Sequence, residues 1–173
     1  VGIGAIANIS RTVSIPLLSF AECTTNAGAL LSFTDGTDAH PHLANSSTDG
    51  LGYTLSFDAT GGSVDTDYVC AQIPVPQDYV DGGVIVVRAT KGAETGANSE
   101  LITCQISVNG AALTTAGTIA TSGTASAAYS CPPTLTGVTA GAALGITLRI
   151  TSGGTADDAV NFQAVEFRYT ATE

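Results

Sequence analysis

The 173-residue sequence contains no tryptophan and only two histidines. Charged residues make up 12% of the chain, whereas soluble proteins typically contain about 25%. Without tryptophan, the Cys-Trp-Cys pattern of immunoglobulin domains is absent, and so is an indole platform for holding sugar rings. These absences disfavour an immunoglobulin-like sandwich.

Basic residues are scarce, since five lysines and arginines stand against fifteen acidic residues and give a formal net charge of −10. The cations are scattered through the chain and form no basic stripe with aromatic residues between its members. They are Arg11, Arg88, Lys91, Arg149 and Arg168. A net negative charge repels both a phosphate backbone and anionic lipid. We therefore predict that neither nucleic acid nor a membrane is a partner.

Long hydrophobic runs are also missing, although 44% of the residues are hydrophobic. Glycine, threonine, serine or a charged residue interrupts each stretch well before the roughly 18 residues that a membrane-spanning helix requires. No segment shows a sustained period of about 3.6 residues either. These patterns disfavour both a transmembrane helix and a helical fold.

The common sequence motifs of hydrolases are absent, because the chain has no Gly-x-Ser-x-Gly and no His-Glu-x-x-His. Both histidines fall in one short segment, which leaves little for acid–base catalysis elsewhere. The sequence therefore predicts that the protein is not an enzyme and has no cofactor.

One dense polar cluster contains candidate metal ligands, because two imidazoles and two carboxylates fall within eight residues. These ligands are Asp35, Asp38, His40 and His42. We favour the simpler interpretation of a solvated surface loop, since His-x-His alone is a common pattern. The paired carboxylates Asp157-Asp158 receive the same interpretation, as do Asp65 and Asp67 near the Gly61-Gly62 turn, and no metal site is predicted.

Four cysteines at wide spacing, Cys23, Cys70, Cys104 and Cys131, form no Cys-x-x-Cys pair. A structural zinc site is therefore disfavoured. Two alternatives remain open at this point: two disulfides in an oxidising compartment, or small buried side chains in a reducing cytoplasm.

Apolar and polar residues alternate with the period of two that is typical of half-buried β-strands. The clearest alternation covers residues 51–58, 102–108 and 144–151, and weaker strand patterns cover 12–18, 30–33, 67–75, 83–90, 127–131 and 159–170. Turn residues such as Asn109-Gly110 separate them, and we interpret residues 111–128 as a loop with a short strand. Eight or nine antiparallel strands at this spacing predict an all-β fold, a jelly-roll β-sandwich.

The N-terminal residues are apolar and rich in glycine, and they lack the basic region of a signal peptide. We interpret residues 1–10 as an N-terminal arm and residues 11–173 as a single domain. The arm supplies the expected partner-contact residues, which are Val1, Ile3, Ile6, Ile9 and Arg11.

Three stretches together resemble a known group of proteins. They are residues 73–88, which contain Pro-Gln-Asp-Tyr, residues 148–169, which end in Glu-Phe-Arg-Tyr, and residues 12–18. They are similar to the jelly-roll cement or decoration proteins, auxiliary capsid proteins of tailed bacteriophages. The resemblance implies a homotrimer on the outer capsid surface of the virion, where it binds the major capsid protein and stabilises its lattice.

Two other functions remain as alternatives. The first is a receptor-binding or fibre-tip β-sandwich domain, which would require a cluster of tyrosines on the surface. The second is a subunit of a secreted extracellular filament, in which the apolar arm is donated to the next subunit as a strand. The second alternative places the protein outside the cell, with oxidised cysteines.

Overall fold

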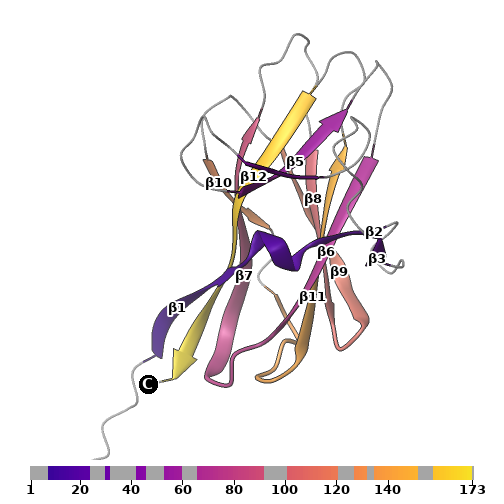
Figure 1. Cartoon of the computed structure of the whole chain (residues 1–173). Coiled ribbons are helices and arrows are strands. Elements are labelled where there is room, and N and C mark those ends of the chain that lie inside the picture. The colour runs from indigo at the N-terminus through magenta and orange to yellow at the C-terminus, as the bar shows by residue number, and fades with distance from the viewer. Residues whose placement is uncertain are drawn as a thin grey trace, which may run out of the picture.

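The computed structural model describes residues 8–23, 30–31, 42–45, 53–59, 66–91, 101–120, 127–131, 135–151 and 158–172. They form a β-sandwich of two antiparallel sheets (Figure 1). The predicted all-β jelly-roll sandwich is confirmed by these strand pairings.

Sheet A contains six strands in the order β10-β7-β12-β5-β4, with β1 also paired to β12. Its strands are β1 (Asn8–Ile15), β4 (His42–Asn45), β5 (Tyr53–Ala59), β7 (Tyr79–Lys91), β10 (Ala127–Cys131) and β12 (Asp158–Thr172).

Sheet B also contains six strands, in the order β3-β2-β6-β11-β8-β9. They are β2 (Ala21–Cys23), β3 (Leu30–Leu31), β6 (Thr66–Pro74), β8 (Leu101–Val108), β9 (Ala111–Ala120) and β11 (Ala143–Thr151). A single turn of 3-10 helix, η1 (Leu17–Ser19), connects β1 of sheet A to β2 of sheet B.

Successive strands from β5 onward alternate between the sheets, apart from the hairpin of β8 and β9 within sheet B. That hairpin turns at Asn109 and Gly110, whose φ angles are 50° and 81°. Positive φ at both positions suits the tight turn that the Asn-Gly pair predicts. The alternation brings residues from distant parts of the sequence into one core.

Each of the nine predicted strand segments has a counterpart in the structure, and β2, β4 and β9 are additional. The interpretation of residues 111–128 was wrong over its first ten residues, which form β9. This segment lacks a clean apolar alternation, but it pairs with β8 from Val108↔Ala111 to Leu101↔Ala120. Backbone pairing with an existing strand therefore determined its conformation where side-chain pattern did not.

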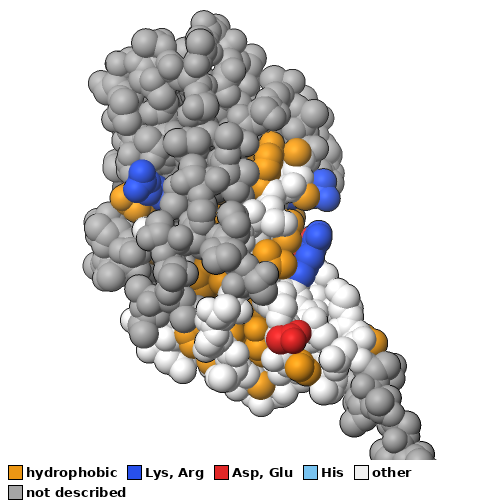
Figure 2. All heavy atoms as spheres, turned by 180° about the vertical axis from the view of Figure 1, so that it is seen from behind, with side chains coloured by type: hydrophobic (Ala, Val, Ile, Leu, Met, Phe, Trp, Pro, Cys, Tyr) orange, Lys and Arg blue, Asp and Glu red, His pale blue; other side chains and the backbone are white. Residues whose placement is uncertain are grey.

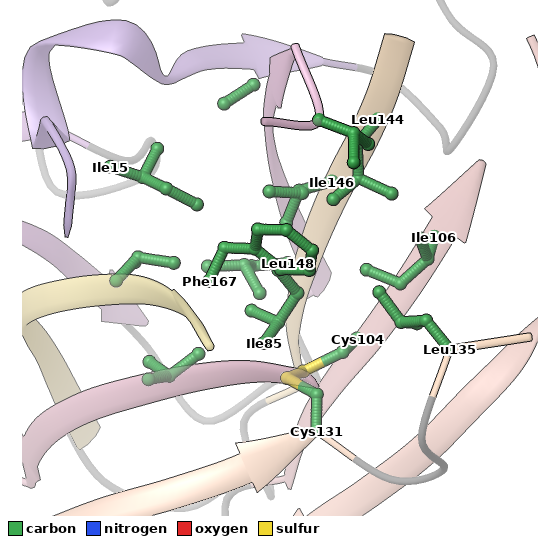
Figure 3. Packing of buried hydrophobic residues seen from close by; sticks show 14 of the residues in the cluster. Ile15, Ile85, Cys104, Ile106, Cys131, Leu135, Leu144, Ile146, Leu148 and Phe167 are labelled. Carbon is green, nitrogen blue, oxygen red and sulfur yellow. A yellow bond between two sulfur atoms is a disulfide. The ribbon is translucent and has the colours of Figure 1, made fainter. Parts of the chain in front are cut away.

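The core lies between the sheets, and Figure 3 shows its side chains converging from both of them. The alternation predicted over residues 144–151 places Leu144, Ile146 and Leu148 together on the apolar face of β11, and all three are at most 1% exposed. Phe162 and Phe167 of β12 face them from sheet A with no exposed surface. Burial of these large apolar side chains is the main favourable term in the stability of the sandwich.

All four cysteines form disulfides, which decides between the two alternatives left by the sequence. Cys23 pairs with Cys70 within sheet B. Cys104 of sheet B pairs with Cys131 of sheet A and so links the two layers through the core (Figure 3). Disulfides are typical of proteins outside reducing compartments, which agrees with an extracellular or outer-surface location. Among the described residues, we find no helix with the length and hydropathy of a membrane span.

Candidate interaction surface

The candidate interaction surface consists of β1 and the C-terminal half of β12. β1 pairs with β12 from Asn8↔Thr172 to Ile15↔Val165, whereas β5 pairs with residues 158–162 of the same strand. β7 occupies the opposite edge of β12. Since a strand has only two edges, β1 and β5 lie end to end along one edge of β12 (Figure 1).

The two faces of β1 differ in chemistry. The outward-facing side chains are all small and polar, and all are exposed: Asn8, Ser10, Thr12 and Ser14. The opposite face directs Ile9, Val13 and Ile15 toward the core. Ile15 is 3% exposed, whereas Ile9 and Val13 remain partly exposed. The strand therefore closes this side of the sandwich with an incompletely covered apolar face.

Asp78 connects three segments at the end of this surface. One carboxylate oxygen, Oδ2, lies 3.2 Å from Nε of Arg11 in β1. The other, Oδ1, accepts a hydrogen bond of 2.9 Å from the hydroxyl of Tyr169 in β12. The backbone carbonyl of Asp78 accepts a third bond, of 3.1 Å, from the amide of Thr172. We call Arg11, Asp78 and Tyr169 the Asp78 clasp.

The turn between β6 and β7 positions Asp78. The amide of Tyr79 donates to the carbonyl of Pro76 at 3.2 Å and closes the turn. The preceding Val75 is fixed from both sides, because its amide donates to Ala142 at 2.9 Å and its carbonyl accepts from Gly141 at 3.0 Å. The turn that carries Asp78 therefore follows a residue, Val75, whose amide and carbonyl are both hydrogen-bonded.

The ring of Tyr169 in the clasp packs with two further aromatic rings, those of Phe167 and Tyr79. The ring of Phe167 is 5.3 Å from that of Tyr169 and 6.0 Å from that of Tyr79, between centroids. Tyr169 is 5% exposed. Its burial raises the pKa of its phenol above the ordinary tyrosine value, and Asp78 adds to this effect through the hydrogen bond and its charge, whereas Arg11 opposes it. The phenol therefore stays protonated and acts as a hydrogen-bond donor to Asp78.

The rest of the described surface is sparsely charged. On β12, Arg168 and Glu166 form an ion pair of 2.7 Å. Among the described residues, the exposed large hydrophobic side chains are Leu18, at 68%, and Val80, at 41%. Figure 2 shows the molecule from behind, relative to Figure 1. On this face the charged side chains of the described residues are few and separated. This surface offers hydroxyl and backbone groups more than charge.

The predicted partner-contact residues divide into two groups. Val1, Ile3 and Ile6 lie outside the described residues. Ile9 packs against the core of its own domain, and Arg11 pairs with Asp78. Residues 8–10 of the predicted arm belong to β1, so the part of the arm within the described residues is a strand of the sandwich.

The candidate metal ligands are not brought together by the described residues. His42 is the first residue of β4, which corrects its predicted place in a loop, whereas Asp35, Asp38 and His40 lie outside the described residues. Asp67 lies in β6 and Asp158 in β12, whereas Asp65 and Asp157 also lie outside. Where the structure describes the chain, no three potential ligands form a group that could hold a metal ion.

Sequence reasoning did not identify Asp78 and Tyr169 as interacting residues. Both belong to stretches singled out by the resemblance, Pro-Gln-Asp-Tyr and Glu-Phe-Arg-Tyr. They are 91 positions apart, and no spacing rule connects a turn to a strand at that separation. Their place in two of the stretches that carry the resemblance was the available signal.

Comparison with known proteins gives little further information. No family model matches the sequence, and no curated protein matches it. The solved structure of TmCBM61 in complex with β-1,4-galactotriose is similar over 95% of this chain and 88% of that chain, with 10% sequence identity and a TM-score of 0.44. This likeness is too low to carry an argument, and the fold assignment rests on the strand pairing.

Proposed function

We propose that the chain is a capsid cement or decoration protein, a non-catalytic structural protein that binds the major capsid lattice from outside. The observation that carries the proposal is the contact between two of the three stretches that carry the resemblance. Asp78 of the Pro-Gln-Asp-Tyr turn accepts the hydrogen bond from Tyr169 of the terminal strand. Two short sequence motifs that contact each other in the fold support a common origin with the decoration proteins better than two isolated matches do.

The surface chemistry also supports a role in assembly. A β-sandwich with a low charge density and a row of small polar side chains along β1 suits many weak contacts that symmetry repeats. The two disulfides fit the outer surface of a particle and a secreted filament equally. We further propose a homotrimer, with Val1, Ile3 and Ile6 contacting the capsid.

The fibre-tip alternative receives less support because its tyrosines are not clustered on the described surface. Tyr79 and Tyr169 are 9% and 5% exposed and stack on Phe167. Tyr68 and Tyr129 are partly buried, and Tyr129 packs against the core. This leaves little aromatic surface for stacking against a sugar.

The direct test uses particles purified from the virus or cells that encode this chain. We expect immunogold labelling to place the protein on the outside of the head, and we expect stripped heads to lose heat resistance and regain it when the purified protein is added back. Absence of the protein from the particles, or its recovery from the medium as filaments, would contradict the proposal.

Variants of the N-terminal residues sharpen this test. Replacing Val1, Ile3 and Ile6 with serine removes the apolar side chains, and replacing Gly2 and Gly4 with serine is the matched control. We expect only the first variant to lose head binding, while both keep the urea midpoint of the unaltered protein. A truncation should end at residue 7, because Asn8 begins β1.

A further inference from the structure

β1 is attached to its own domain along one edge only. Within the described residues it pairs with β12 and with no other strand. It is followed directly by Pro16 and η1, which lead to β2 in the other sheet. A strand that pairs with one neighbour, beside a short connection, is the kind of element that can be exchanged between copies of a chain.

The position that β1 occupies can accept only a strand of matching length and pattern. β5 covers the N-terminal part of this edge of β12, so removal of β1 would leave this edge of Val165–Thr172 without a partner strand, while β7 would stay paired along the other edge. It would also uncover the core beneath Ile9, Val13 and Ile15. An exposed edge over an apolar core favours pairing with another strand, and β1 of a second copy matches it in every residue.

The contacts that hold β1 can form equally well between two copies. The ion pair of Arg11 with Asp78 joins side chains that are 48% and 31% exposed, and such surface pairs contribute little to stability. In an exchanged arrangement the same ion pair and the same eight backbone pairings form in trans, so the contacts within the interface change little. The connection through Pro16 then determines which arrangement has the lower free energy.

The distribution of charge favours approach at this end of the molecule. The chain carries fifteen acidic residues, yet residues 1–21 contain none. Two copies with a net charge of −10 each repel one another least where acidic side chains are absent. Residues 1–21, whose one charged side chain is the cation Arg11, are therefore a part of the chain that a second acidic copy can approach.

We infer that β1 is exchanged between copies of this chain, so that β1 of one copy pairs with β12 of the next. The bound partner is a second copy, and the docking surface is the Val165–Thr172 edge of β12 with the Asp78 clasp at its end. Exchange around a closed ring accounts for a symmetric oligomer without a separate interface. This inference concerns the purified protein and does not depend on the capsid proposal.

The test uses two cysteines placed on either side of the β1–β12 pairing. Ser10 and Thr170 are directly opposite each other, and the native cysteines are all in disulfides. We expect the Ser10→Cys, Thr170→Cys variant, treated with a short bis-maleimide under non-reducing conditions, to give covalent oligomers on a denaturing gel. Single Ser10→Cys and Thr170→Cys chains that are unfolded and refolded together should give a covalent heterodimer.

The control replaces Ser10→Cys with Ser130→Cys, an exposed serine on β10, and should give no heterodimer with Thr170→Cys. Cross-linking confined to a single chain, with all thiols consumed at the highest soluble concentration, would overturn the inference. If the first double variant does not fold, Thr12→Cys with Arg168→Cys repeats the test at the next outward-facing pair. Head binding is not measured, so failure here leaves the capsid proposal to its own experiment.

Discussion

The hydroxyl of Tyr169 and the carboxylate of Asp78, 91 residues apart in the chain, are joined by a hydrogen bond of 2.9 Å. The same carboxylate pairs with Arg11. One acidic side chain therefore connects the first described strand, the turn before β7 and the last strand. Its partners meet at the edge of β12 where we infer that β1 of another copy binds.

The hydroxyl of Tyr169 should contribute measurably to stability. A Tyr169→Phe variant keeps the ring stacked on Phe167 but removes the donor to Asp78, and hydrogen bonds to charged groups are worth about 1.5 to 3 kcal/mol. We expect the lower end of that range, about 1.5 kcal/mol, because Asp78 is partly exposed. Urea unfolding measures the change, and Tyr79→Phe is the control, expected to cost less. Equal effects of the two variants would rule out a specific role for the bond.

Stability should fall at alkaline pH because of the same phenol. The folded state holds the proton of Tyr169 more tightly than the unfolded chain does, since the pKa is raised by burial and by Asp78. This contribution is complete below about pH 10, the ordinary tyrosine value, and is lost as the pH rises through the raised pKa. The urea midpoint should therefore fall less steeply in Tyr169→Phe than in the unaltered protein above about pH 10. Parallel curves would contradict the assignment.

The loss in the free energy of unfolding when a leucine is replaced with alanine should depend on how deeply that leucine is buried. Leu148 has no exposed surface and Leu18 is 68% exposed. Leu148→Ala leaves a cavity in the core and should cost about 3 kcal/mol or more, whereas Leu18→Ala should change the free energy of unfolding by less than about 0.5 kcal/mol. Chemical unfolding of the two variants makes the comparison. A large loss in Leu18→Ala would show that this side chain has a partner.

Gly83 should be required because of the aromatic rings above it. A Cβ at this position would lie 3.0 Å from Cε2 of Phe167 and 3.3 Å from Cε2 of Tyr79. Gly83→Ala should therefore cost about 1 to 3 kcal/mol through overpacking. The cost should shrink in a Phe167→Leu background, where the ring is gone. Gly110→Ala provides the control, since nothing lies within 4 Å of its Cβ position, and its cost should be the same in both backgrounds.

The two disulfides should differ in their sensitivity to reductant. Cys104 and Cys131 are at most 1% exposed, whereas Cys70 is partly exposed at the outer side of sheet B. Attack by a thiolate requires access to a sulfur. Mild reduction followed by alkylation and mass spectrometry should therefore detect opening of Cys23–Cys70 first. Earlier opening of Cys104–Cys131 would indicate that the core opens more readily than the outer face of sheet B.

Much of the sandwich could be predicted from alternation of apolar and polar residues. Leu144, Ile146 and Leu148 were identified as inward-facing because the period of two in β11 is regular, and all three are buried. The pattern failed for β9, whose alanines and threonines do not distinguish one face from the other. Its conformation depends on pairing with β8, a tertiary contact that the segment itself does not encode.

The sequence by itself determined the fold class, the turn at Asn109-Gly110 and the low charge of the surface, because these follow from local period, turn chemistry and composition. Only the tertiary structure decided which cysteines pair, where β1 lies and that Asp78 meets Tyr169 and Arg11. Each of these depends on the order of strands in the two sheets, which brings together residues separated by tens of positions. Local interactions cannot specify that order, since it results from burial of the whole core at once.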